Sequence, residues 1–514
     1  MTTFTKIPED QTPCISIDVS RRLAKINPNI YGGFTEHIGR CIYGGIYEPG
    51  SSLSDKKTGF RKDVLAALKE LKVPVVRYPG GNFVASYHWM DGIGPKELRP
   101  TRPELAWRDT ETNQFGTDEF LHWCEVLGTE PYLCFNMGTG TLDEALAWVE
   151  YCNGSGNTHY ANLRRKNGRE KPYNVKYWGL GNEVWGDWQI EQTTMEAYAT
   201  KTVQWAKALK KLDGSLELIL CGNTGHTKWD QHVLLECIPW ISMHSLHTYT
   251  AANHRHLPNV TAPRSAERSI QIASGLIDLA RIERGIPPWE KRQTLCFDEW
   301  NVWDSGRANP ERGAEEQYTL SDALAVGAWL NVFIRQAKDV GMACIAQSVN
   351  VISPLMTTKK GIWKQTTWWP LLLFCKYMRG ETVGVHVWSG TYDGDTEPWW
   401  IRSISCETPW LDVSACVDDD GWAGLVVINI HPDKDFPTDI KGLKKVREVK
   451  VFNVTGSDVE IRNADGVENV KVKESSWDAE GKFTFGKHSL TLLRWKVVDF
   501  GIGGDPEDQE WVRV

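Results

Sequence analysis

The chain has 514 residues, of which 41% are hydrophobic and 24% charged, and its formal net charge is -8. This length is enough for a large barrel and a second domain, and the ordinary composition excludes disordered, collagen-like and coiled-coil proteins. The negative charge and the lack of a Lys/Arg-rich run with interleaved aromatics exclude a nucleic-acid partner. No apolar run approaches the roughly 18 residues that a membrane span requires.

The amino-terminal stretch MTTFTKIPEDQTPC has no apolar segment of signal-peptide type. We therefore expect a cytoplasmic protein, or a secreted one if a leader was removed before Met1. The alternation in CISIDVS predicts a strand, and residues 1–24 are expected to join a β domain. The 12 cysteines are scattered without a CxxC pair, which favours buried free thiols over disulfides or a zinc site.

Short apolar runs alternate with amphipathic helical stretches from residue 30 to about 380. The runs that predict strands are 30–38, 73–82, 131–138, 175–183, 216–223, 241–249, 293–301 and 343–350. Helical periodicity marks 63–72, 142–152, 195–211, 267–283 and 318–338. Such alternation predicts a parallel sheet buried on both faces, and eight strands close a (β/α)8 TIM barrel over 25–384. A doubly wound sheet is the alternative, but its Gly-rich dinucleotide motif is missing.

The pattern changes after residue 384, where short alternating segments are separated by Gly/Asp-rich turns. We predict an all-β sandwich or jelly-roll domain over 385–514, and the tail 500–514 has no assignment. The chain has 25 tryptophans, an excess that sugar stacking could use. For the cluster of Trp399, Trp400 and Trp410, a buried interdomain contact is favoured over a substrate subsite.

Side chains that can hydrogen-bond a hydroxyl group follow nearly every predicted strand. They are Glu36 and His37, Arg77 with Asn82, Asn136, Asn182 with Glu183, Asn223, His247 with Tyr249, Asp298 with Glu299, and Gln347 with Asn350. The carboxyl ends of barrel strands form the active site of TIM-barrel enzymes, so this ring favours a neutral polyhydroxylated substrate. It holds no metal-ligand cluster or phosphate cradle, and we expect no metal and no cofactor.

Two of these strand ends carry a glutamate within an aromatic context, Glu183 in YWGLGNEVW and Glu299 in LCFDEWNVW. Glycosidic cleavage needs one protonated and one ionised carboxyl group on either side of the bond. The fourth and seventh strands of a barrel lie across its mouth from each other, which suits that geometry. By contrast, His244 and His247 are separated by an odd spacing on a strand and cannot chelate one ion.

The sequence resembles the α-L-arabinofuranosidases of glycoside hydrolase family 51. The motifs that carry the resemblance run over almost the whole chain: IYGGFTEHIGRCIYGGIYE, VVRYPGGNFVASYHWMDGIGP, LAWRDTETNQFG, WGLGNEVWGDWQ, SLHTY, FDEWNVW and IAQSVNVISPLM. The resemblance implies a retaining enzyme that releases arabinofuranosyl groups from arabinoxylan, arabinan or their oligosaccharides. It also implies a homo-oligomer, often a hexamer.

The resemblance further assigns roles to matching positions. Glu183 would be the general acid/base and Glu299 the nucleophile, oriented by His247 and Tyr249. The remaining matches would bind or enclose the sugar: Asn182 at the 2-hydroxyl group, Glu36 and Gln347 at other hydroxyl groups, and Trp107 and Phe34 as pocket walls. Asn82 stands where some members carry a cysteine, which leaves its side-chain role open.

Two departures from the family pattern concern the cleft. The segment VWGDWQ places Trp185 beside it, and the stretch 305–317 looks short compared with bacterial members. Both favour an open cleft that accepts polymeric or branched substrate. Two alternatives stay open: a hydrolase of a β-xylan or β-glucan backbone with the same glutamates, and a non-catalytic carbohydrate-binding barrel.

Overall fold

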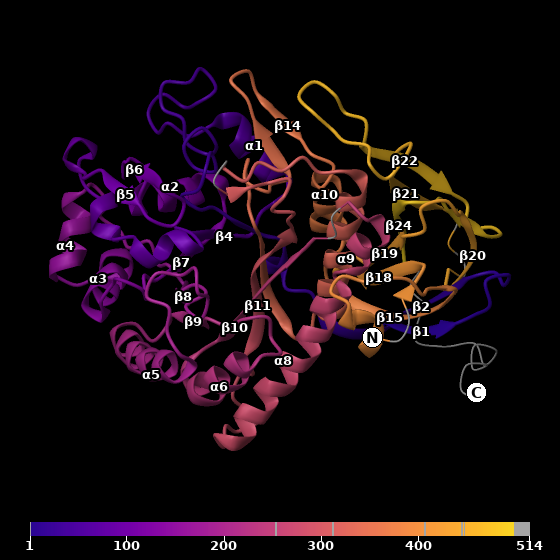
Figure 1. Cartoon of the computed structure of the whole chain (residues 1–514), viewed down its shortest axis with the longest axis horizontal. Helices are drawn as coiled ribbons and strands as arrows, with labels where there is room; N and C mark the ends of the chain where they lie inside the picture. The colour runs from indigo at the N-terminus through magenta and orange to yellow at the C-terminus, as the bar shows by residue number, and fades with distance from the viewer. Residues whose placement is uncertain are drawn as a thin grey trace.

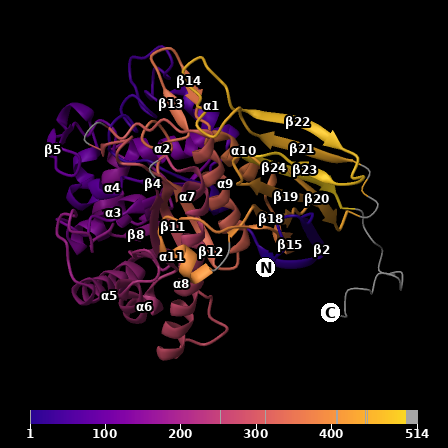
Figure 2. The same ribbon diagram turned by 45° about the vertical axis from the view of Figure 1, so that its right-hand side comes forward.

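The computed structural model describes residues 2–251, 254–310, 313–405, 408–443, 446 and 448–497. The tail 500–514, unassigned from sequence, lies outside the described residues. Two parts lie side by side: a barrel surrounded by helices, and a β domain that is orange to yellow except for the indigo strands β1 and β2 (Figure 1). Figure 2 shows the sheet of the β domain beside helices α9 and α10 of the first part.

Eight parallel strands form a closed barrel, in which β12 pairs with β3. They are β3 (Gly32–Phe34), β4 (Val75–Tyr78), β7 (Glu130–Cys134), β8 (Tyr177–Leu180), β9 (Glu217–Leu220), β10 (Met243–Thr250), β11 (Thr294–Val302) and β12 (Val340–Ile345). Each overlaps one of the eight predicted runs. The predicted TIM barrel is therefore confirmed, and the doubly wound alternative is wrong.

Helices cover the outside of the barrel. They are α1 (Lys62–Glu70), α2 (Thr117–Leu127), α3 (Leu142–Asn153), α4 (His159–Lys166), α5 (Met195–Leu212), α6 (Lys228–Cys237), α7 (His256–Thr261), α8 (Arg264–Glu283), α9 (Leu320–Arg335) and α10 (Trp368–Tyr377). Short 3-10 helices are η1 (Pro28–Tyr31), η2 (Asn82–Ser86), η3 (Trp89–Gly92), η4 (Lys96–Leu98) and η5 (Ile238–Trp240). In α1, Val64, Leu65 and Leu68 face inward, as their spacing predicts.

The β domain contains a ten-stranded sheet to which both ends of the chain contribute. Its strands are β1 (Thr2–Lys6), β2 (Cys14–Lys25), β15 (Glu381–Ser389), β18 (Leu411–Val417), β19 (Trp422–Asn429), β20 (Phe436–Lys441), β21 (Val449–Val454), β22 (Val472–Trp477), β23 (Phe483–Phe485) and β24 (Ser489–Lys496). Two-stranded ribbons are β5–β6 (Arg102–Glu104, Asp109–Glu111), β13–β14 (Leu355–Thr357, Ile362–Lys364) and β16–β17 (Thr391–Tyr392, Thr408–Pro409). A mostly-β carboxyl-terminal domain is thus confirmed, and the expected boundary at residue 384 falls inside β15.

The sheet is buried on both faces. Leu425, Val427 and Leu493 belong to the core of the β domain itself, whereas Ile428 and Leu490 belong to the core shared with the barrel. A Cβ atom on Gly327 of α9 would lie 2.6 Å from Leu490, so this glycine permits close packing of helix and sheet. This contact packs the two parts against each other.

Two helical segments differ from the sequence expectation. Helix α9 was predicted to be amphipathic, but residues Leu320–Ile334 are all buried because the helix lies between the barrel and the sheet. The basic composition of the run Arg164–Lys171 is typical of an exposed loop. Arg164 instead lies in the last turn of α4, is fully buried, and donates to the backbone carbonyl groups of Tyr151 and Gly154. No helix of the described residues is long and apolar enough to span a membrane.

Candidate active site

The carboxyl ends of the barrel strands surround a cleft of about 430 Å³. Eight of the ten predicted site residues line it: Glu36, Asn82, Trp107, Glu183, His247, Tyr249, Glu299 and Gln347. The other two, Asn182 and Phe34, are buried beside it. The rest of the wall is mostly apolar and comes from Ile38, Gly81, Trp185, Trp188, Trp303, Pro310, Ala314, Val351 and Ile352.

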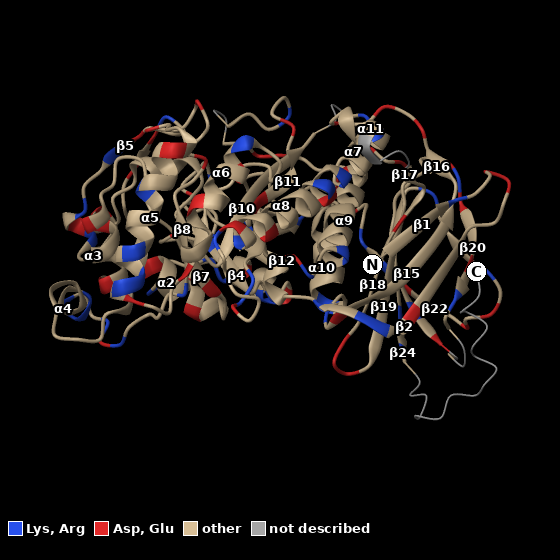
Figure 3. Ribbon diagram, turned by 90° about the horizontal axis from the view of Figure 1, so that it is seen from below, with Lys and Arg blue, Asp and Glu red and all other residues tan. Residues whose placement is uncertain are grey.

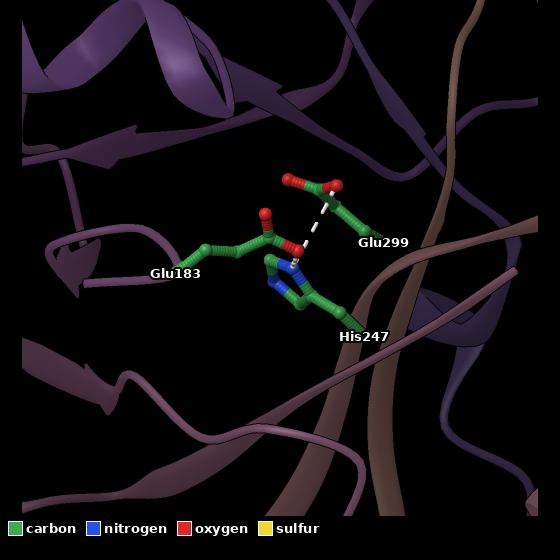
Figure 4. A group of neighbouring side chains, drawn as sticks. All are labelled: Glu183, His247 and Glu299. Carbon is green, nitrogen blue, oxygen red and sulfur yellow. Dashed lines mark hydrogen bonds and ion pairs between the residues drawn. The ribbon is translucent and has the colours of Figure 1, made fainter. Parts of the chain in front are cut away.

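Glu183 and Glu299 face each other across the floor of the cleft with His247 between them (Figure 4). One carboxylate oxygen of each glutamate and a ring nitrogen of His247 all lie within 4.8 Å of one another. Glu183 follows β8, and Glu299 lies on β11. Two carboxylates at this separation can act on the same covalent bond.

Glu299 is held on both oxygens. Arg77 Nη1 donates to Oε1 at 2.6 Å, and the Tyr249 hydroxyl group donates to Oε2 at 2.8 Å. Arg77 is buried and also donates from Nη2 to Asn182 Oδ1 at 2.6 Å. Burial and the charge of Glu299 raise the pKa of Tyr249 well above its usual range, so its hydroxyl group stays a donor. These contacts fix the direction of the Glu299 carboxylate and compensate its charge.

His247 links both glutamates to a third carboxylate, that of Asp298. Its Nδ1 atom lies 2.9 Å from Glu183 Oε1 and 3.6 Å from Glu299 Oε2, and its Nε2 atom lies 3.3 Å from Asp298 Oδ1. Burial disfavours the charged ring, but the charges of Glu299 and Asp298 outweigh it and raise the pKa of His247 to about 10. These charges thus favour the imidazolium form, in which both ring nitrogens are donors.

Asp298 is itself buried and fully satisfied. It accepts hydrogen bonds from the hydroxyl groups of Tyr132, at 2.7 Å, and Ser245. Burial raises the pKa of Asp298, but Arg77 and His247 lower it below its ordinary value. Asp298 thus supplies a permanent negative charge under the catalytic pair.

A further carboxylate group, that of Glu36, lies near Glu299, since a Cβ atom on Gly81 would lie 2.8 Å from Glu299 Oε1 and 3.4 Å from Glu36 Oε2. Its Oε1 accepts from the Phe83 backbone at 3.1 Å and from Trp107 Nε1 at 3.0 Å, and its Oε2 accepts from Gln347 Nε2 at 2.9 Å. Burial and the nearby charge of Glu299 raise the pKa of Glu36 to about 7. Near neutral pH it can therefore donate or accept a hydrogen bond to a sugar hydroxyl group.

The backbone near the cleft approaches these carboxylates closely. A Cβ atom on Gly81 would lie 2.8 Å from Glu299 Oε1, and one on Gly80 would lie 2.6 Å from Glu36 Cγ. Glu183 has a left-handed backbone with φ 42°, directly after the turn at Gly181 with φ 83°. A non-glycine residue rarely adopts this conformation, and such residues concentrate at functional sites.

Phe34 does not line the cleft as a pocket wall, contrary to the sequence expectation. Its side chain is 1% exposed, and the Arg77 guanidinium group lies 4.6 Å from the centre of its ring. Asn182 is also below the surface of the cleft, where its Nδ2 lies 3.5 Å from Asn82 Oδ1. Phe34 therefore supports Arg77.

Sequence reasoning did not select Trp188 as a site residue. Its Nε1 donates to Glu183 Oε2 at 3.0 Å, although the side chain is 55% exposed. Trp185 lines the cleft as expected and donates from Nε1 to Gly222 O at 2.8 Å. The sequence signal that could have identified Trp188 as a site residue is its position five residues after Glu183, in a Trp-rich turn. His244 is fully buried and pairs with Asp230 at 2.9 Å.

Among the described residues, Glu183, His247 and Glu299 form the single group of three side chains spaced to hold a metal ion. In this group His247 Nδ1 contacts both glutamates, at 2.9 Å from Glu183 Oε1 and 3.6 Å from Glu299 Oε2.

A closed barrel with two facing glutamates and a ring of hydroxyl-binding side chains defines a glycoside hydrolase. Residues 67–264 match the α-L-arabinofuranosidase 1 domain, and residues 298–489 match the α-L-arabinofuranosidase C-terminal domain. The probable α-L-arabinofuranosidase C of Aspergillus flavus is 66% identical over 97% of this chain and 100% of its own.

Two bacterial enzymes extend this similarity. The intracellular exo-α-(1→5)-L-arabinofuranosidase of Acetivibrio thermocellus is 34% identical over 95% of this chain and 99% of its own. The structure of the GH51 α-L-arabinofuranosidase of Thermotoga petrophila superposes with a TM-score of 0.85 at 37% identity, over 94% of this chain and 100% of that one. The chain belongs to the α-L-arabinofuranosidases of glycoside hydrolase family 51. The alternative of a non-catalytic barrel is thereby wrong.

Proposed function

We propose that the enzyme releases terminal α-L-arabinofuranosyl groups by a retaining, double-displacement mechanism. The observation that carries this proposal is the approach of the Glu183 and Glu299 oxygens to within 4.8 Å. Retaining glycosidases separate their carboxyl groups by about 5–5.5 Å, whereas inverting enzymes need about 6.5–9.5 Å to admit a water molecule. The separation here leaves no room for that water.

In the first step, Glu299 attacks the anomeric carbon while the glycosidic C–O bond breaks. The leaving oxygen takes the proton of Glu183, and the sugar becomes an ester of Glu299. In the second step, Glu183 takes a proton from water, and the resulting hydroxide oxygen attacks the anomeric carbon and releases Glu299. Two inversions give net retention.

The surrounding residues divide into two groups. Arg77, Tyr249 and His247 hold the two glutamates through the hydrogen bonds described above. Glu36, Gln347, Trp107, Asn82 and Asn182 are proposed to bind the sugar, with Asn182 at the 2-hydroxyl group, where a hydrogen bond strengthens in the transition state. Phe34 takes no direct part, because it lies behind Arg77.

The substrate we propose is an arabinan or arabinoxylan chain, or oligosaccharides from them. The cleft is partly walled by Pro310 and Ala314 of the stretch 305–317, and the sequence suggests an open cleft there. The similar Acetivibrio enzyme is an intracellular exo-α-(1→5)-L-arabinofuranosidase, which supports exo action and a location inside the cell. A homo-oligomeric state remains a proposal from the family resemblance.

Glu299→Ala and Glu183→Ala test the mechanism with 4-nitrophenyl α-L-arabinofuranoside as substrate. Both should lose most activity. Azide should rescue Glu183→Ala with an arabinosyl azide of retained configuration, because azide attacks the glycosyl-enzyme. Azide should rescue Glu299→Ala with inverted configuration, because azide then replaces the nucleophile. Proton NMR of the parent reaction should show retained configuration in the first-formed arabinose, and an inverted product would refute the proposal.

The β-xyloside and polymeric xylan serve as comparison substrates. Faster cleavage of a xylan backbone than of the arabinofuranoside would favour the backbone-cleaving alternative.

A further inference from the structure

An excursion of the β domain reaches the face of the barrel that carries the catalytic cleft. Between β15 and β18 the chain forms the ribbon β16–β17 and the helix α11 (Trp400–Ser405). In Figure 3, α11 lies at the same edge of the molecule as α7 and β5, away from the opposite edge where α4 lies. The hairpin of β5 follows the carboxyl end of β4, so α11 shares the side of the barrel where the active site opens.

Two contacts attach this excursion to barrel loops. The rings of Trp400 and His226 pack edge to face with their centres 5.7 Å apart. Arg255 Nη2 lies 3.3 Å from Glu397 Oε2. His226 belongs to the loop after β9 and Arg255 to the loop after β10, and both loops follow the carboxyl ends of barrel strands. The excursion is therefore seated on the catalytic face.

The same loop after β9 contacts the wall of the cleft. Trp185, which lines the cleft, donates to Gly222 O, and its ring lies 5.3 Å from that of Trp188 in an edge-to-face arrangement. Gly222 and His226 are four residues apart, which an extended chain spans in at most roughly 14 Å. The loop after β9 therefore connects the aromatic wall beside Glu183 with the contact that seats the excursion.

Trp399 precedes Trp400 in this excursion, and its side chain is 76% exposed. No other large apolar side chain in 390–403 or 408–410 is exposed to a comparable degree. The charged side chains close to Trp399 in sequence are paired. Arg402 lies 3.3 Å from Asp393, and Glu397 lies 3.3 Å from Arg255. A single ring among balanced charges suits a neutral hydroxylated ligand better than a protein surface, which would bury a contiguous apolar patch.

We propose that Trp399 is a distal subsite that stacks on a sugar residue of the polymer, several residues from the bond that is cleaved. The ligand class is an uncharged polysaccharide chain, whose C–H faces pack on indole rings while its hydroxyl groups reach the flanking charged side chains. The proposal rests on the glycosidase function proposed above. Trp185 and Trp188 lie nearest the bond, Trp400 anchors the excursion on His226, and Trp399 receives the chain.

The test compares Trp399→Ala with Trp289→Ala as a matched control. Trp289 is 82% exposed but lies in the loop before β11, at the amino-terminal end of the barrel. For each variant, kcat/KM is measured on soluble arabinan, on arabinoxylan and on 4-nitrophenyl α-L-arabinofuranoside. Trp399→Ala should lose about threefold to tenfold on at least one polymer and nothing on the small substrate, and the control should lose nothing on any.

Binding gives an independent readout. Isothermal titration of arabinan and arabinoxylan into Glu299→Ala, with and without Trp399→Ala, should show weaker binding of at least one polymer in the double variant by a similar factor. Unchanged binding and unchanged polymer kinetics would overturn the subsite, as would an equal loss on the small substrate or in the control. Failure of the proposed function would instead appear as no cleavage of the small arabinofuranoside by the parent enzyme.

Discussion

Replacement of Asp298 by Asn should make the enzyme sensitive to alkaline pH. Asp298 is buried and lies 3.3 Å from His247 Nε2, and it accepts from the hydroxyl groups of Tyr132 and Ser245. The amide of asparagine has the same shape and keeps one acceptor oxygen. The substitution therefore removes one negative charge from beneath the catalytic pair with little change in packing.

The expected magnitude follows from the pKa of His247. The rise from 6.5 to about 10 corresponds to about 5 kcal/mol in favour of the imidazolium form. Burial opposes this form, and the charges of Glu299 and Asp298 produce it. An opposite charge within hydrogen-bonding distance changes a pKa by about one to three units, so in Asp298→Asn His247 should lose its proton between about pH 7 and 9.

The sign of the effect is fixed by the direction of the change. Because folding raises the pKa of His247, its stabilising contribution is complete below pH 6.5 and is lost as pH rises through about 10. In Asp298→Asn the stabilising contribution of protonated His247 is lost at lower pH than in the parent. The neutral ring no longer presents a charged donor to Glu183, and a hydrogen bond to a charged group contributes about 1.5–3 kcal/mol.

The assay is kcat/KM on 4-nitrophenyl α-L-arabinofuranoside against pH, with NMR of ¹⁵N-labelled histidine to follow the ring. Asp298→Asn should stay within a few-fold of the parent near pH 6 and fall at least about tenfold below it near pH 9. His247→Gln cannot titrate, so its spectrum identifies the NMR signal of His247. When His247 is replaced by Gln, Asp298→Asn should no longer lower kcat/KM more at pH 9 than at pH 6. The reasoning is refuted if Asp298→Asn loses activity equally at all pH values or if His247 titrates as in the parent.

Three further predictions concern the walls of the cleft. Gly81→Ala places a Cβ atom 2.8 Å from Glu299 Oε1, and kcat should fall about a hundredfold while the thermal unfolding temperature changes little; an unchanged kcat would contradict this. Since the pKa of Glu36 is about 7, KM of the parent should change as pH crosses 7, and Glu36→Gln should abolish that change; a variant with the parental profile would exclude Glu36 as its source. Trp188→Phe removes the donor to Glu183 Oε2 and should lower kcat/KM about threefold to tenfold, most for alkyl arabinofuranosides, whose leaving groups need protonation; equal losses on aryl and alkyl substrates would argue for a packing role.

The sequence predicted the catalytic pair because it depends on local pattern. Glu183 follows the apolar strand β8, and Glu299 lies in the carboxyl-terminal half of β11. Parallel strands bring all their carboxyl ends to one face of a barrel. To predict that Glu183 and Glu299 lie close together, it was enough to count the strands of the barrel, and no contact between distant residues had to be known. The same reasoning located Glu36, His247 and Gln347 around the cleft.

Other features required the direction of individual side chains. Phe34 is the last residue of β3, and Glu36 comes two residues later. Phe34 nevertheless packs against Arg77, whereas Glu36 lines the cleft. Side chains alternate between the two faces of a sheet only along a strand, and β3 ends at Phe34. Sequence spacing alone therefore could not show that Phe34 supports Arg77 whereas Glu36 lines the cleft. Trp188 was missed for a similar reason, because its contact with Glu183 is made by a turn and not by a strand or helix.

Sequence periodicity and strand-end chemistry by themselves determined the closed barrel, the mostly-β carboxyl-terminal domain and the two glutamates. Only the tertiary structure decided that α9 is buried on every side, that nearby carboxylates raise the pKa of His247, and that an excursion of the β domain reaches the catalytic face. The reason is physical. Periodicity records which side of one element avoids water, whereas burial between two domains and the pKa of a buried ring depend on groups that the chain brings together from far apart.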